Sequence, residues 1–112
     1  MGLDNFWKMD NENNGSVEGD YKVCGGIFTD NGNDSFRGKV YNSIIENITG
    51  VSLYESEITA PIVEQMNKQI QECTYKTAKS YSQYDLEEKE WEDFQRMWND
   101  HAEAGHYLVS WY

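Results

Sequence analysis

The chain has 112 residues, the size of one domain, and we expect a single domain over residues 1–112. Its 20 acidic and 9 basic residues give a net charge of -11, which argues against direct binding to nucleic acid or to an anionic membrane surface. No apolar run is long enough to cross a membrane, and the two cysteines allow at most one disulfide. The sequence therefore predicts a cytoplasmic protein with reduced thiols, in which Cys24 is accessible and Cys73 is buried and inert.

Short β-prone patterns predict strands at residues 6–9, 20–28 and 106–112. The segment between the first two, residues 10–19, is too polar for a core element and carries a turn signal at Asn14-Gly15. We therefore expect an acidic, solvated hairpin loop there.

The same loop partly follows the spacing of a calcium-binding EF-hand. Calcium requires a bidentate carboxylate at the last position of that motif, and Tyr21 occupies it in this chain. A full EF-hand is thereby excluded. A weak calcium site at Asp10, Glu12 and Asp20 is the alternative to a plain solvated loop.

Three amphipathic patterns predict helices. The first helix is expected to begin near Ser35 and to run to residue 48, with Thr49-Gly50 closing it. The second has Thr59 or Ala60 as its cap, with Pro61 in the first turn, and extends to about residue 76 or 79. Its expected buried stripe consists of Ile62, Met66, Ile70 and Cys73.

A linker rich in Ser and Tyr is expected at residues 77–84. The third helix then starts at Asp85, because Glu88 three residues later completes a capping-box pattern, and Gly105 is its stop signal. Its expected apolar face comprises Leu86, Trp91, Phe94, Trp98, His101 and Ala102. The elements together predict an α+β fold: three helices packed on a small antiparallel sheet formed by the N-terminal strands and the C-terminal strand, with the two termini close together.

Two cations stand where a helix N-terminus favours anions. Arg37 and Lys39 fall in the first turns of the helix expected at residues 35–48, next to the positive end of its dipole. The glycine spacing and Val40 after the lysine exclude a phosphate-binding P-loop. Two alternatives stay open: a small-anion or small-ligand site at Ser35, Arg37, Gly38 and Lys39, or internal pairing of both cations with carboxylates.

No catalytic or cofactor-binding pattern is complete. His101 and Glu103 have the spacing of zinc deaminases, but the required cysteine pair is missing. We expect His101 and His106 to cap carbonyls or cover the core, and the alternative is a metal that they share with Glu103. The sequence therefore predicts a protein that is not an enzyme and holds no cofactor.

The start of the third helix is strongly acidic. Five carboxylates crowd its first turns, namely Glu87, Glu88, Glu90, Glu92 and Asp93. They suit the helix dipole as a solvated face, and they can also present a negative field to a basic protein partner. Exposed tyrosines nearby, such as Tyr75, Tyr81 and Tyr84, would strengthen such an interaction surface.

Four segments resemble small uncharacterised proteins of tailed phages, especially phages of cyanobacteria. They read MGLDNFW at residues 1–7, CGGIF at 24–28, SFRGKVY at 35–41 and ITGVSLY at 48–54. The resemblance implies an accessory protein that works in the host cytoplasm, and it implies no activity. The leading hypothesis is a small acidic protein that binds a protein partner through an acidic and aromatic surface.

Overall fold

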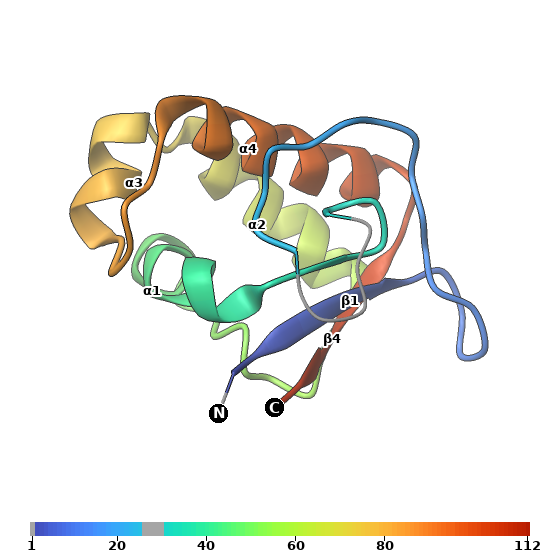
Figure 1. The fold of residues 1–112 in the computed structure, drawn as a ribbon. Coiled ribbons are helices and arrows are strands. Elements are labelled where there is room, and N and C mark those ends of the chain that lie inside the picture. The colour runs from blue at the N-terminus through green and yellow to red at the C-terminus, as the bar shows by residue number, and fades with distance from the viewer. Residues whose placement is uncertain (1, 26–30) are drawn as a thin grey trace.

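The computed structural model describes residues 2–25 and 31–112, and within them the chain forms four helices and one four-stranded antiparallel sheet (Figure 1). The strands are β1 (Asp4–Lys8), β2 (Ser35–Phe36), β3 (Glu57–Ile58) and β4 (Tyr107–Trp111). The helices are α1 (Gly38–Thr49), α2 (Ala60–Glu72), α3 (Tyr75–Tyr81) and α4 (Glu88–Glu103). The mixed fold with an antiparallel sheet is confirmed, but the expected number of helices is wrong by one.

The sheet has the order β2-β1-β4-β3, so the longest strands form its centre. Strands β1 and β4 pair from Asp4 opposite Trp111 to Lys8 opposite Tyr107. The N- and C-terminal ends therefore lie side by side, as Figure 1 shows and as the sequence predicts.

One face of the sheet carries the hydrophobic core. Its side chains are at most 2% exposed, and they are Asn5, Trp7, Phe36, Ile58 and Leu108. Helices α1 and α2 contact β1 and β4 respectively, and buried side chains of all four helices join the same core cluster. Trp7 lies centrally, because its ring centroid is 5.0 Å from that of Trp98 and its Nε1 donates to Met97 Sδ at 3.2 Å.

The first helix begins at Gly38 and not near Ser35. Ser35 and Phe36 instead form β2, pairing with β1, and Arg37 is the extended N-cap residue of α1. Gly38 is required at the start of the helix because an added Cβ would collide with Asn5 Oδ1. The apolar spacing from Phe36 onward is helical, but Ser35 and Phe36, the first two residues of the expected helix, pair with β1 instead.

The second helix ends earlier than the sequence predicts, and a fourth helix follows it. Helix α2 stops at Glu72, and the Thr74 side chain accepts a hydrogen bond from the Thr77 N–H at 3.2 Å, which caps α3. The linker expected at residues 77–84 is therefore wrong up to Tyr81. The core face of α2 also differs, because Val63 is fully buried while Ile62 is 40% exposed.

Helix α4 has the expected apolar face but a later start. Trp91, Phe94, Trp98 and His101 are all buried, as predicted. The helix begins at Glu88, and its N-cap, Glu87, makes no side-chain capping bond, so the predicted capping box at Asp85 is wrong. Among the described residues, no helix has the length and apolar character needed to traverse a bilayer.

The N-terminal loop is less regular than expected. Residues 20–25 form no strand, so that prediction is wrong there, and residues 26–28 lie outside the described part. The turn signal at Asn14-Gly15 also places the turn too late in the chain. The Met9 N–H donates to the Asn13 carbonyl at 3.1 Å, and Lys8 forms an isolated β-bridge with Asn14. The turn thus precedes Asn14-Gly15, and Gly15 packs against the His106 ring.

Candidate functional site

The structure does not gather the four residues of the predicted anion site. Ser35 is buried in β2, and its Oγ has no hydrogen-bond partner among the described residues. The Arg37 guanidinium lies over the Gly2 backbone, and Gly38 is buried against Asn5. Lys39 lines a pocket whose other walls do not include Ser35, Arg37 or Gly38.

The start of α1 also has few free donors for an anion. The Arg37 N–H donates to the Cys24 carbonyl at 2.7 Å, and the Lys39 N–H donates to the Leu3 carbonyl at 3.1 Å. The Val40 N–H bonds the Arg37 carbonyl. Since anion binding at a helix N-terminus depends on free N–H groups, the first turn of α1 is poorly suited to it.

The proposed internal pairing of the two cations is likewise not observed. The ion pairs of the described residues join Lys22 to Glu87 and join Asp93 to both Lys89 and Arg96. Neither Arg37 nor Lys39 belongs to an ion pair within residues 2–25 and 31–112.

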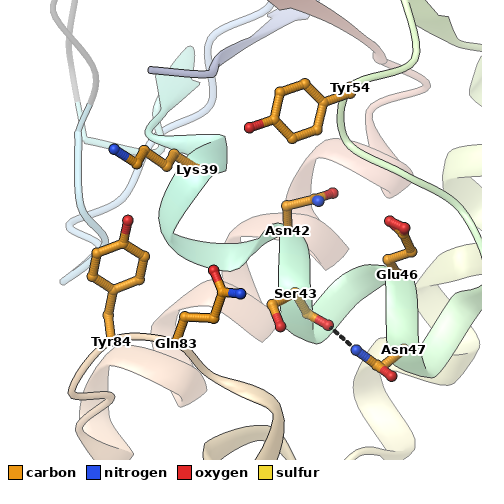
Figure 2. A pocket seen from close by; sticks show the side chains of 8 residues that line it. All are labelled: Lys39, Asn42, Ser43, Glu46, Asn47, Tyr54, Gln83 and Tyr84. Carbon is orange, nitrogen blue, oxygen red and sulfur yellow. Dashed lines mark hydrogen bonds between the residues drawn. The ribbon is translucent and has the colours of Figure 1, made fainter. Parts of the chain in front are cut away.

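Lys39 instead opens onto a pocket of about 310 Å³ between α1 and the segment that joins α3 to α4 (Figure 2). Its lining consists of Lys39, Asn42, Ser43, Glu46, Asn47, Tyr54, Gln83 and Tyr84, and we call it the tyrosine pocket. Figure 2 shows the Tyr54 and Tyr84 rings on two sides of the polar face of α1. The pocket therefore combines two aromatic walls with a polar floor.

Hydrogen bonds hold the walls of the tyrosine pocket in place. Asn42 Oδ1 accepts from the Leu53 N–H at 2.7 Å, which fixes the segment leading to Tyr54. Ser43 Oγ donates to the Tyr81 carbonyl at 2.6 Å, which ties the end of α3 to α1. The floor is thus built from one helix, and the two walls come from segments that fold back onto it.

Several polar groups remain directed at the pocket. Tyr54 is 38% exposed and Tyr84 is 43% exposed, and the Tyr54 ring packs on Tyr112 at 5.1 Å between centroids. Lys39 supplies a cation and Glu46 an anion, both on exposed positions of α1. Half-exposed tyrosines with amide and hydroxyl neighbours are typical of protein recognition surfaces, because they bury area with little loss of entropy.

The predicted acidic interaction surface is divided by the fold. Three of its five carboxylates have internal roles: Glu87 pairs with Lys22, Glu90 accepts from Tyr41 Oη at 2.6 Å, and Asp93 is buried. Glu88 and Glu92 are exposed on α4.

Asp93 connects α4 to the N-terminal loop. Its carboxylate accepts from the Lys22 N–H at 2.6 Å and pairs with Lys89 at 3.0 Å and Arg96 at 3.3 Å. Burial alone would raise the pKa of the Asp93 carboxyl, but these three donors outweigh burial and lower it. Asp93 is therefore a structural anion and not part of a contact surface.

Two residues of the weak calcium site, Asp10 and Asp20, have different surroundings. Asp10 Oδ1 accepts from the Glu12 and Asn13 N–H groups at 2.8 Å each, so it shapes the turn. The Asn13 side chain and these two N–H groups lower the pKa of the Asp10 carboxyl. Asp20 lies beside Tyr21 and Lys22 in another hollow. In the part of the chain that the structure describes, no three His, Cys, Asp or Glu side chains form a group able to hold a metal ion.

The histidines and cysteines belong to the packing of the fold. His101 is buried against Trp7 and contacts His106, in line with the expected core role. Cys73 is buried and Cys24 is exposed, as the sequence predicts. Burial and the Glu90 carboxylate raise the pKa of the Cys24 thiol, while Arg37 acts in the opposite direction, so the group is a thiol at neutral pH.

Sequence reasoning missed most of the tyrosine pocket. Asn42, Glu46 and Asn47 could have been found as the polar face of α1, opposite the buried Tyr41 stripe. Tyr54 and Gln83 carry no local signal, because only the tertiary fold brings them beside α1. Comparison with protein-family models, curated proteins and solved structures found no match, so the geometry of the site is the basis for a functional assignment.

Proposed function

We propose that this chain is a small acidic accessory protein that acts by binding a protein partner, with the tyrosine pocket as the centre of the contact. The observation that carries the proposal is the pocket itself, in which half-exposed Tyr54 and Tyr84 flank a polar helix face. Tyrosines of this kind are common binding hot spots, since each buries a large ring and offers a hydroxyl. The resemblance of the N-terminal half to small tailed-phage proteins is consistent with an accessory role in the host cytoplasm.

The net charge supports a basic partner surface. With 20 acidic and 9 basic residues, the chain repels acidic proteins and attracts basic ones over a Debye length. Glu88 and Glu92 lie exposed on α4 and would add to this attraction. The pocket would then provide the specific contact, and the charge would speed the encounter.

Two tyrosines allow a matched test. Tyr84 lines the pocket, while Tyr81 is similarly exposed on the neighbouring segment without lining it. Affinity capture from a lysate of the expressing cell should recover a specific protein with the parent chain and with Tyr81→Ser, and much less of it with Tyr84→Ser. Recovery that is equal for the two variants, or that does not fall with added salt, would reject the proposal.

Lys39 favours a second candidate function, a small-anion or small-ligand module in the same pocket. Its ammonium group is exposed at the rim, and the Asn42 and Gln83 side chains offer donors beside it. A thermal-shift screen with phosphate, sulfate and nucleotides tests this candidate, because a bound ligand raises the unfolding temperature. A rise that disappears in Lys39→Gln would support the ligand module over the protein-binding role.

A further inference from the structure

A second pocket shares one lining residue, Glu46, with the tyrosine pocket. It has a volume of about 320 Å³ and is lined by Glu46, Gly50, Val51, Ser52, Glu55, Glu57, Ile58 and Ile62. We call it the acidic pocket. Because Glu46 lines both hollows, the two form neighbouring parts of one contact surface.

The acidic pocket has a partly exposed aliphatic lining, in which Ile62 is the most exposed side chain. Ile62 is 40% exposed on α2, although its neighbour Val63 is fully buried. Val51 is half-buried and Ile58 almost fully buried in the same hollow. When another apolar group covers an apolar patch in a concave surface, the free energy of the system falls.

The rim of this hollow is strongly negative. Glu46, Glu55 and Glu57 are exposed, none of them belongs to an ion pair within the described residues, and none of the lining residues is basic. The C-terminal end of α1 adds its negative dipole, since Gly50 is its C-cap and its last turn contains no cation. The charge therefore favours a cation and disfavours an anion.

An arginine side chain fits both properties. Its methylene stem can cover Ile62 and Val51, and its guanidinium can donate to the carboxylates at the rim in a bidentate manner. A bare metal ion fits poorly, because it would leave the aliphatic lining in water and because no three metal-ligating side chains gather among the described residues.

We propose that the acidic pocket accepts an arginine side chain from an exposed segment of the protein partner whose remaining contacts lie in the tyrosine pocket. This inference rests on the proposed function and defines the partner more closely: it presents an arginine beside the group that packs on Tyr84. Electrostatic complementarity between the three carboxylates of the rim and one guanidinium sets the choice of residue.

The probe is the blocked pentapeptide acetyl-Gly-Ser-Arg-Ser-Gly-amide, and its control carries citrulline, the neutral isostere of arginine. Amide NMR spectra of the full chain should show saturable shifts at residues 50–58 and 62 with the arginine peptide. The citrulline peptide should bind at least about fivefold more weakly, because it loses the summed attraction of three exposed carboxylates. Equal binding of the two peptides would overturn the proposal.

Two double variants separate the pocket from the overall charge. Glu55→Gln with Glu57→Gln removes two carboxylates of the rim, and Glu88→Gln with Glu92→Gln removes two exposed carboxylates of α4. The first pair should weaken binding of the arginine peptide by at least about fivefold, and the second should leave it within about twofold. An equal loss of affinity in both double variants would mean that the peptide is attracted by the overall negative charge, and it would overturn the assignment of arginine to the acidic pocket.

Failure of this inference is distinguishable from failure of the proposed function. Tyr84→Ser should leave the peptide shifts at residues 50–58 unchanged, because Tyr84 does not line the acidic pocket. If capture of the partner depends on Tyr84 while the arginine peptide gives no shifts, only the arginine assignment is wrong. If the shifts appear while the Tyr84→Ser variant captures as much of the partner as the parent chain, the proposed role of the tyrosine pocket is wrong.

Discussion

His101 Nδ1 lies 2.8 Å from His106 Nδ1, and this contact fixes the tautomers of both rings. His101 Nε2 lies 2.9 Å from the Gly32 carbonyl oxygen, which can only accept a hydrogen bond, so Nε2 carries the hydrogen. His101 Nδ1 is therefore the acceptor, and His106 Nδ1–H donates to it. A second proton on His101 would place two donors face to face in a buried site.

This pair predicts a loss of stability in mild acid. Burial is the main cause that lowers the pKa of His101, to about 3 from 6.5, with the Gly32 carbonyl opposing it. The unfolded chain binds more protons than the folded chain between these two values. The contribution of His101 to stability should thus be complete above about pH 6.5 and fall toward about pH 3, by at most about 1.4 kcal/mol per pH unit.

Urea unfolding over this range, together with NMR titration of the imidazole carbons, checks the expectation. The His101 signals should stay those of a neutral ring down to about pH 4.5, where an unperturbed histidine is protonated. A His101 titration near its ordinary pKa would contradict the buried, neutral pair.

Asp93→Asn should lower the free energy of unfolding by about 1–3 kcal/mol, because it removes a buried anion that accepts from Lys22, Lys89 and Arg96. Glu92→Gln is the control, since that neighbour is exposed and should change stability by less than about 0.5 kcal/mol. Chemical denaturation of both variants gives the comparison. Equal effects would mean that Asp93 does not connect α4 to the N-terminal loop.

Gly38→Ala should destabilise the protein by more than about 1 kcal/mol, although alanine is normally favoured over glycine within a helix by about 1 kcal/mol. The reason is the collision of the new Cβ with Asn5 Oδ1. A double-mutant cycle with Asn5→Ala checks the cause by chemical denaturation, because the penalty should shrink once the amide is gone. A stabilised Gly38→Ala variant would refute the close approach.

Cys24 should react with a thiol reagent in the folded protein, whereas Cys73 should react only on unfolding, because one is exposed and the other buried. Glu90→Gln should speed the labelling of Cys24 at neutral pH, since the Glu90 carboxylate helps to raise its pKa. Glu92→Gln, with the same change in net charge, should have a smaller effect. Mass spectrometry of labelled protein over time gives both rates, and faster labelling of Cys73 than of Cys24 would contradict this.

The sequence predicts the elements in which the apolar pattern extends over many residues. The buried face of α4 through Trp91, Phe94 and Trp98 follows directly from helical spacing, and the hydrophobic alternation of β4 identifies the last strand. The two-residue strands β2 and β3 are too short to leave a pattern. The sequence does not predict helix α3, because Ser, Thr and Tyr are weak helix formers. The buried side chain of Ala78 helps to hold this helix against the core.

The candidate site was harder to predict than the fold. Asp93 looks like one exposed carboxylate among five, but it lies four residues before the buried Met97, and this spacing is its only local sign of burial. Ile62 reads as a core residue because it stands four residues before Met66 and eight before Ile70, yet in α2 the side chain of Val63 is the one that is buried. A helical stripe predicts a face, and only packing decides which of two adjacent apolar residues the core accepts.

The central pairing of β1 with β4 has a consequence for how the chain acquires its sheet. Asp4 pairs with Trp111, and β3 joins the described sheet through β4, so the strand that links β1 to β3 comes after both of them in the chain. During synthesis the helices can form early, because their contacts are local. Strand β1 can pair with β4 only after residues 107–111 have left the ribosome. Contacts between such distant segments form more slowly than local ones, so we expect the sheet to be completed after the helices form.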